Sequence, residues 1–532
     1  VTSPSPSAIM SEAVEDRDSC IPDTVKNFVF DLHDATRRSQ VPAEARNLYV
    51  VEYKSLCEKY FANSAWPSPA GVSSECNADP IFLALYGELT TRHFHGACRT
   101  GVRDRIDSWR SYRHLFDTLL ELANDPAADT MGGLCVPPEW AFAAMNEFVY
   151  QFQAFCQFRT NLGGRKEHDL TVLRENKDAW AVETVMFYLH GLVRVGCPEP
   201  GGPPPPTAGH AAFGTYAAVG LSRLECLLGD YTSCLSALRP LGGAVASVVP
   251  VECAPGGAKD DPLHGITAAR ATVAYHAGVS YLLLRRYRDA ARTMSPMSAV
   301  LLRGLRSGTL RRAPGGEQLP KLADRMVALL AIVSHLCPAA GACCSEEVRT
   351  HVQDRHGDAL AKIDSGDEGY EELFAHACPK FVSPAVPNYD RAGGSAGGAP
   401  PPDASKAAYN LQVRGFAGET AGHGPLRRLR SYLKLYTSIR NDKLAAFNDM
   451  GVNRLAGLLC GYKLKMFQLE NSSLYGPAGV PKDPLEGSVK SALDVEYYVE
   501  ADVVYVEGEE DGRGHDEHFL KQIESCNEIS GE

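Results

Sequence analysis

Two segments of this 532-residue chain share a pattern that restricts the fold to stacked helices. In residues 220–238, and again in residues 279–294, an apolar-periodic stretch is followed by a tight break, a tyrosine (Tyr231 or Tyr287) and a second periodic stretch. Apolar residues that recur every three to four positions indicate an amphipathic helix. Each segment therefore predicts a helical hairpin, and their repetition predicts a mainly α, TPR-like helical-repeat solenoid.

Long apolar stripes support the same fold class. Pro137 and Pro138 suit a helix start, and the residues after them place apolar side chains on one helical face. Residues 182–193 repeat this spacing. We interpret both stripes as core rather than as a cofactor site. The first stripe consists of Phe142, Met145, Val149, Phe152 and Cys156, widened by Phe148 and Phe155.

Near the C-terminus the pattern changes to three short helices and two strands. Residues 429–436, 441–447 and 452–468 have helical periodicity. Residues 495–499 and 503–506 are rich in strand formers and are joined by a short turn, which predicts a β-hairpin. This order predicts a winged helix that closes the helical stack. The side chains expected to face inward from the third helix are Leu455, Leu458, Leu459, Tyr462 and Met466.

Segments rich in glycine, proline and alanine separate the helical stretches. Such compositions bury little apolar surface, so we expect loops or insertions that are partly disordered. The segments are 197–209, 250–262, 312–320, 392–402 and 475–487.

The net charge of −12 is unevenly placed. Residues 494–532 hold 13 Asp/Glu and 2 Lys/Arg, a balance of −11, which leaves −1 for the rest of the chain. A nearly neutral body lacks the broad positive field of a protein that binds nucleic acid through phosphates alone. For the two local basic clusters we favour solvated helix faces over an RNA contact, and the second cluster is the candidate for facing RNA or the ribosome. The clusters are Arg285, Arg286, Arg288 and Arg292, and Arg427, Arg428, Arg430 and Lys434.

The sixteen cysteines show no Cys-x-x-Cys pair and no regular spacing. We expect reduced, structural thiols, with Cys343 and Cys344 the most exposed. No apolar run approaches the about 20 residues of a membrane span, and residues 1–9 do not resemble a secretory signal. These features predict a cytoplasmic protein without a membrane contact.

Motifs of common enzyme classes do not occur in the context that their chemistry requires. The Gly-x-Ser-x-Gly match at residues 393–397 lies in the segment rich in glycine, proline and alanine, not between a strand and a helix, so it is no nucleophile elbow. There is no phosphate-binding Gly-x4-Gly-Lys-Ser/Thr loop and no His-Glu-x-x-His helix. His93, His95 and Cys98 are potential zinc ligands, but no partner pair follows at a structural-zinc spacing. We interpret them as a helix end, and we expect no catalytic, metal or cofactor site.

Several long segments carry a resemblance to a known family. Helical hairpins followed by a winged helix are the plan of the PCI domain, which occurs in the proteasome lid, the signalosome and translation initiation factor 3. Within that group the chain resembles the subunit L family of eukaryotic translation initiation factor 3, from about residue 28 to residue 523. The segments that carry the resemblance are 31–40, 79–89, 147–155, 229–231, 285–290, 370–374, 378–390, 431–437 and 443–445.

The resemblance implies a non-catalytic scaffold subunit. It would assemble with the K and E subunits of the factor and the rest of the PCI/MPN core, and help the factor bind the small ribosomal subunit. The expected domains are a disordered segment (1–20), a helical-repeat region (21–265), a PCI domain (266–508) and an acidic tail with a short helix (509–532). Within the PCI domain, residues 266–428 are helical and residues 429–508 form the winged helix.

For the winged helix we expect docking through the hairpin. Val503 and Tyr505 would lie on one face, Val504 and Val506 on the other, and the backbone would pair with a neighbouring subunit. Val504→Pro would then release the partner while helical content stays nearly unchanged. The interface candidates are Val503, Val504, Tyr505, Val506, Tyr497 and Tyr498.

Two alternatives remain open from sequence alone. One is a subunit of another PCI assembly, such as the proteasome lid or the signalosome. The other is a winged-helix RNA-binding protein. Acidic residues on the strands, such as Glu496 and Glu500, would repel phosphate and disfavour the second alternative.

Overall fold

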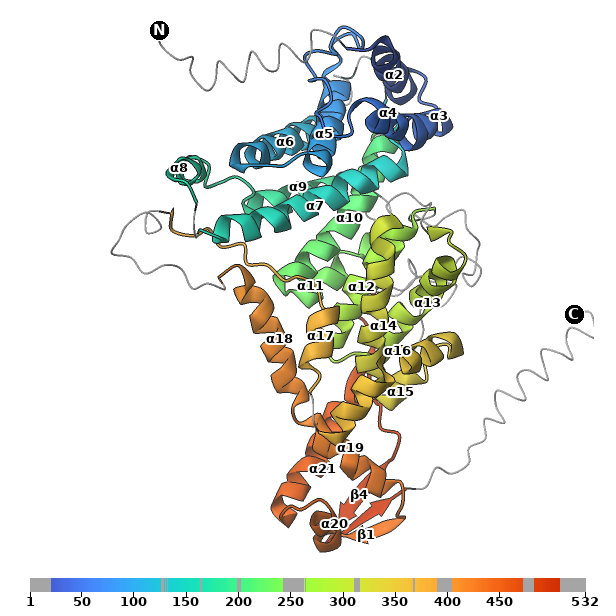
Figure 1. Ribbon diagram of the computed structural model, residues 1–532. Helices are drawn as coiled ribbons and strands as arrows, with labels where there is room; N and C mark the ends of the chain where they lie inside the picture. The colour runs from blue at the N-terminus through green and yellow to red at the C-terminus, as the bar shows by residue number, and fades with distance from the viewer. Residues whose placement is uncertain are drawn as a thin grey trace, which may run out of the picture.

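A computed structural model shows a mainly α chain that ends in a small α/β unit, as predicted (Figure 1). Helices α2 to α6 lie at one end of the molecule, and the β-strands lie at the other. The structure describes residues 21–507 except 126–128, 130, 132, 163–164, 199–201, 243–262, 264, 311–315, 367–368, 390–403 and 472–482. The segments expected to be disordered at 1–20, 250–262 and 392–402, and the acidic tail at 509–532, lie outside the described residues.

The first half of the chain is a stack of helices. Two π-helical turns, η1 (Asp34–Arg38) and η2 (Leu48–Glu52), continue the helices before them. The α-helices are α2 (Asp23–His33), α3 (Pro42–Asn47), α4 (Tyr53–Tyr60), α5 (Pro80–Ala97), α6 (Val102–Asn124), α7 (Pro138–Thr160), α8 (Glu167–Glu175), α9 (Val182–Gly196), α10 (Ala208–Leu228) and α11 (Tyr231–Ser236).

The stripe predicted after Pro138 is the core of this stack. Helix α7 begins at Pro138, and all seven predicted stripe residues are buried. The Phe148 ring packs 5.3 Å from Trp180 and 4.9 Å from Phe116, measured between centroids. The interpretation of this stripe as core is confirmed.

The two predicted helical hairpins are present, and their breaks have the same geometry. Gly229 (φ 90°) and Arg285 (φ 58°) adopt left-handed backbone two residues before the tyrosine. In each break the next backbone N–H donates to a carbonyl one turn back: Asp230 to Glu225 at 3.0 Å and Arg286 to Tyr281 at 2.8 Å. This is the hydrogen bond that closes a helix C-terminus, and a new helix begins at the tyrosine.

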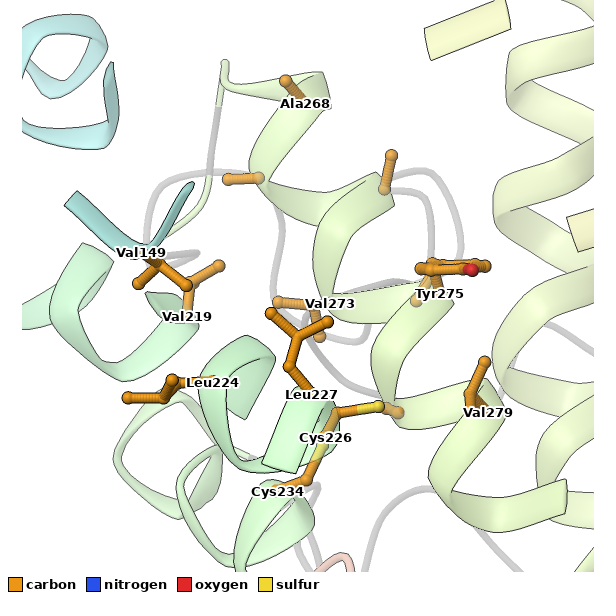
Figure 2. Packing of buried hydrophobic residues seen from close by; sticks show 14 of the residues in the cluster. Val149, Val219, Leu224, Cys226, Leu227, Cys234, Ala268, Val273, Tyr275 and Val279 are labelled. Carbon is orange, nitrogen blue, oxygen red and sulfur yellow. The ribbon is translucent and has the colours of Figure 1, made fainter. Parts of the chain in front are cut away.

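The second half of the chain continues the stack. Figure 2 shows the continuous packing, with Val149 of α7 beside Val219 of α10 and Leu227 of α10 beside Val273 of the next helix. The helices are α12 (Thr267–Leu283), α13 (Tyr287–Arg306), η8 (Gly316–Gln318, 3-10), α14 (Leu319–Leu336), α15 (Pro338–Gly341), α16 (Glu346–Ser365), α17 (Glu371–Ala377), η10 (Ala404–Lys406, 3-10) and α18 (Ala407–Thr420).

Residues 378–389, which we call the strap, tie the two halves together. The strap leaves α17 without regular structure and runs along α7. Gln153 Nε2 donates to the Lys380 carbonyl at 2.8 Å, and Arg159 donates to the Pro384 carbonyl. Since these bonds link residues more than 200 positions apart, the strap holds α7 against the later helices.

The C-terminal unit has the predicted order of helices and hairpin, with additional strands. The first helix starts six residues before the predicted start, and the third ends two residues before its predicted end. Strand β1 and the pairing of β2 with β3 were not predicted. The elements are α19 (His423–Leu433), β1 (Ser438–Arg440), α20 (Asn441–Phe447), α21 (Val452–Met466), β2 (Phe467–Glu470), β3 (Ser488–Ser491), β4 (Tyr497–Glu500) and β5 (Val503–Val506).

The helices were predicted to lack a membrane span. Among the residues that the structure describes, no helix combines the length and apolarity that crossing a membrane requires.

Candidate protein-docking surface

The three-stranded sheet of the C-terminal unit has the order β1-β5-β4. Strand β5 therefore lies in the centre, with Val504 opposite Ile439 of β1 on one side and opposite Val499 of β4 on the other. Its backbone pairs within the chain on both sides. The expectation that residues 503–506 pair with another subunit through their backbone is wrong, because β1 already occupies that edge.

Two predicted interface residues are core residues instead. Val504 is fully buried and Tyr497 is 3% exposed. The Tyr497 hydroxyl donates to the Leu459 carbonyl of α21 at 2.6 Å, and its ring stacks on Tyr462. The predicted effect of Val504→Pro is corrected accordingly: proline at this central position would disrupt the sheet itself.

The outer face of the sheet carries two tyrosines. Tyr498 and Tyr505 face each other across β4 and β5, with ring centroids 5.2 Å apart and planes 17° from parallel. They are 45% and 36% exposed, whereas Val503 and Val506 are half-buried. Of the six interface candidates, Tyr498 and Tyr505 are the ones that the structure leaves well exposed.

Within the described residues, no strand pairs with the outer edge of β4, which we call the free edge. The Glu507 N–H donates to the Glu496 carbonyl at 2.9 Å, which makes this a hydrogen-bonded pair of the hairpin. Hydrogen-bonded and non-hydrogen-bonded pairs alternate along an antiparallel ladder. Two positions along β4, Tyr498 is therefore hydrogen-bonded to Tyr505 of β5. Val499, the next residue, directs its N–H and carbonyl away from β5, towards the outer edge of the sheet. Val499 is 48% exposed. Sequence reasoning recognised this residue as part of a strand but not as an interface residue, since the edge depends on which strand lies in the centre.

Exposed apolar side chains also occur on α21, on the other side of the sheet from Tyr498 and Tyr505, and on β2 and β3. Val452, Leu464 and Phe467 are 43%, 67% and 50% exposed, and Val489 of β3 is 68% exposed. Cys460 on the same helix is the exposed cysteine among the described residues, whereas Cys344 is buried and Cys343 half-buried. The prediction that Cys343 and Cys344 are the most exposed thiols is therefore wrong.

We call the outer face and outer edge of the three-stranded sheet the docking surface: Tyr498, Val499 and Tyr505.

Ion pairs join elements within the C-terminal unit and also join the unit to α16. Arg430 Nε donates to both carboxylate oxygens of Asp494 at 2.9 Å, and Lys434 Nζ lies 2.7 Å from the same group. Arg427 Nε lies 2.8 Å from Asp364 of α16. Arg428 is exposed. Carboxylates of the same chain therefore neutralise three of the four cations in the predicted RNA-facing cluster, and these three side chains have a structural role.

The first basic cluster is also engaged internally. Arg286 is 3% exposed and donates to Asp289 at 2.8 Å and to the Pro484 carbonyl at 3.0 Å. Arg288 and Arg292 each approach Glu470 of β2 within 2.7 Å. The interpretation as a solvated helix face is therefore wrong for Arg286, Arg288 and Arg292, which hold strand β2 and the segment before β3 against α13, whereas the Arg285 side chain is 53% exposed.

The buried ion pairs shift the carboxyl pKa values. Burial favours the neutral acid of Asp494, but the hydrogen bonds from Arg430 and Lys434 outweigh it and lower the pKa to about 2. Burial of Glu470 is likewise outweighed by the hydrogen bonds from two arginines, which lower its pKa. Both carboxylates are charged at neutral pH, so the ion pairs of Asp494 and Glu470 are formed under physiological conditions.

Comparison with known proteins decides the family. The model of the family described as "RNA polymerase I-associated factor PAF67" matches residues 104–200 and 203–526. "Eukaryotic translation initiation factor 3 subunit L" of Nematostella vectensis is 30% identical over 527 residues, covering 96% of this chain and 92% of the relative. The proteins of the same name from Xenopus tropicalis and Homo sapiens are each 30% identical over 549 residues, covering 96% of this chain and 90% of the relative.

The chain belongs to the subunit L family of eukaryotic translation initiation factor 3. The resemblance seen in the sequence is confirmed. Because the relatives are matched over nearly their whole length, both the helical stack and the C-terminal unit are part of this family's chain.

The histidines considered as metal ligands bond to backbone groups in this member of the subunit L family. His93 Nε2 lies 2.9 Å from the Phe61 carbonyl, and His95 Nε2 lies 3.3 Å from the Asp104 carbonyl. Over the described parts of residues 21–507, no three His, Cys, Asp or Glu side chains converge as metal ligands would. The helix-end interpretation agrees with these contacts.

Proposed function

We propose that this chain is a non-catalytic scaffold subunit of translation initiation factor 3 that joins its neighbours through the docking surface. In this proposal it assembles with the K and E subunits and the rest of the PCI/MPN core, and supports binding of the factor to the small ribosomal subunit in the cytoplasm. The observation that carries the proposal is the free β4 edge beside the stacked Tyr498–Tyr505 pair.

The chemistry of the docking surface suits a protein partner. A free strand edge accepts another strand through main-chain hydrogen bonds. Tyrosines supply large contact areas with little loss of side-chain entropy, and they are enriched among residues that dominate binding energy. The pair is already stacked, so it is positioned before the partner arrives.

Charge around the edge favours a basic partner over RNA. Glu496, Glu500, Asp502 and Glu507 are all exposed around β4 and β5. These carboxylates repel phosphate, and most cations of the nearby α19 are already paired with carboxylates. The winged-helix RNA-binding alternative is therefore disfavoured at this surface, and we infer that the partner presents lysine or arginine here.

We propose that the chain divides into two domains, with the docking surface at the end of the second. A helical-repeat region at 21–265 and a PCI domain at 266–508, with its winged helix at 429–508, assign the docking surface to one terminal unit. The strap and the continuous core would hold that unit at a fixed position relative to the N-terminal helices.

Affinity purification of the tagged chain from gently lysed cells tests the proposal. Expected are the other subunits of initiation factor 3 in the eluate, and the chain in the small-ribosomal-subunit fractions of a sucrose gradient. Proteasome-lid or signalosome subunits in their place would support the other PCI assemblies. A free monomer would contradict every scaffold assignment.

A further inference from the structure

A cleft of about 650 Å³ lies between α7 of the N-terminal stack and helices of the second half. Its walls come from the start of α6, the end of α7, α14, α17, the strap and the start of α18. Figure 1 shows α18 next to the end of α7. Among its sixteen described lining residues none is aspartate or glutamate, and five are cationic. These five are Arg105, Arg165, Arg325, Lys380 and Lys406.

The charge of this cleft is not neutralised as it is elsewhere in the chain. Arg427, Arg430 and Lys434 all have carboxylate partners. Asp324, which precedes Arg325 in the chain, pairs with Arg355 and His376. Among the described residues, Asp104 and Asp169 lie near Arg105 and Arg165, and Asp324 pairs with the lining residue His376, but none of these carboxylates lines the cleft.

The two arginines on the α6–α7 side are held in place without an anion. Their guanidinium carbons lie 4.6 Å (Arg105) and 3.7 Å (Arg165) from the centroid of the Phe158 ring. Arg165 donates to the carbonyls of Asn161 and Phe158. Arg105 Nε is buried, and no group in the described part of the chain accepts a hydrogen bond from it. Burial lowers the pKa of both groups, so an anion in the cleft would relieve an existing electrostatic cost.

We propose that the cleft binds a small anion that carries several adjacent phosphate groups, such as a nucleoside triphosphate or an inorganic polyphosphate chain. The volume lies within the roughly 300–1,000 Å³ of small-molecule sites. Arginine and lysine are the side chains that bind phosphate most strongly. Asn161, Ser405 and Asn410 also line the cleft and add neutral hydrogen-bonding groups.

Single-stranded RNA fits the cleft less well. Sequence-tolerant RNA sites use free aromatic rings on which bases stack. The ring beside the arginines, Phe158, is already in contact with two guanidinium groups. A bound phosphate chain would instead bridge α6 and α7 to the strap and α18, and so strengthen the junction between the two halves of the molecule.

Isothermal titration calorimetry of the full chain with tripolyphosphate and with ATP tests the proposal. Expected is saturable one-to-one binding that weakens as salt is raised. Lys380 and Lys406 are exposed, so the double variant Lys380→Gln/Lys406→Gln leaves the fold intact; it should bind at least about tenfold more weakly. Arg105→Gln should give a similar loss. The matched control Lys54→Gln/Lys490→Gln removes two exposed lysines elsewhere and should stay within about twofold.

The outcomes separate the sources of the phosphates. Equal affinity for tripolyphosphate and ATP supports recognition of the phosphate chain, and tighter binding of ATP supports a nucleotide. Three results overturn the proposal: no saturable binding of either probe, an equal loss in the control variant, or binding of a uridine oligonucleotide alone. None of these results bears on the docking surface, which lies in the separate C-terminal unit.

Discussion

At the residue scale, Asp494 shows how a single carboxylate secures the C-terminal unit. It pairs with Arg430 of α19 and with Lys434, the residue after that helix, and it lies three residues before β4, so one side chain links the first helix of the unit to its sheet. The carboxylate is only 20% exposed. Its contribution to stability is therefore larger than that of the surface ion pairs elsewhere in the chain.

We predict that Asp494→Asn lowers the free energy of unfolding by about 1–2 kcal/mol at neutral pH. Because the folded pKa of about 2 lies below the ordinary 3.8, the ion pairs stabilise the fold above about pH 4. This stabilisation disappears as the pH falls from 3.8 towards 2. Urea denaturation at a series of pH values should show the gap between wild type and variant closing over that window.

Asp442→Asn is the control for this prediction. Asp442 pairs with Arg440, but both side chains are more than half exposed. Its removal should leave the urea midpoint nearly unchanged at every pH. An Asp494→Asn gap that persists below pH 2 would show that packing, not charge, accounts for the loss.

At the element scale, the elements that local sequence patterns specify were predicted, and those that depend on distant pairing were not. The stripe of α7 and the breaks before Tyr231 and Tyr287 are encoded within a few turns of helix. Strand β1 has three residues, too few for a periodic signal. The carboxylate partner of Arg430 lies 64 residues away, so its ion pair could not be read from the basic cluster itself.

The packing of α9 on α10 gives a prediction at this scale. A Cβ on Gly214 would lie 2.5 Å from the Gly196 Cα and 2.8 Å from the Leu192 carbonyl. Gly214→Ala should therefore push the two helices apart and destabilise the fold by about 1–3 kcal/mol. Thermal unfolding followed by circular dichroism measures the effect.

Gly418→Ala is the matched change on a helix without such a contact. A Cβ on Gly418 of α18 meets nothing within 4 Å. Alanine should be neutral or stabilise the helix by up to about 1 kcal/mol. Equal melting temperatures for both variants would show that the close approach of α9 and α10 is not required.

At the scale of the whole molecule, the docking surface sits at the end opposite the N-terminal helices (Figure 1). The strap and the ion pairs of Arg286, Asp289 and Glu470 make the stack a continuous support for it. The sequence predicted the terminal unit, and its six interface candidates include the two exposed tyrosines as well as the buried Tyr497 and Val504. The prediction placed the free edge on β5 instead of β4. The alternation of apolar and exposed side chains at Val504 and Tyr505 is the same in a central strand and in an edge strand, so it does not show which strand lies at the edge.

The free edge supplies the prediction at this scale. Val499→Pro removes an N–H that points out of the sheet while leaving the bonds between β4 and β5 intact. Val499→Thr keeps both the N–H and the branched side chain. The two variants therefore separate backbone pairing with a neighbour from general damage to the sheet, provided that their circular dichroism spectra match that of the wild type.

The measurement that tests the central claim most directly is the amount of other initiation factor 3 subunits that co-purifies with each tagged variant. The docking account predicts that Val499→Pro retains roughly tenfold less of its neighbours than wild type, whereas Val499→Thr retains them fully. Full retention by Val499→Pro, with its fold unchanged, would contradict docking through the β4 edge.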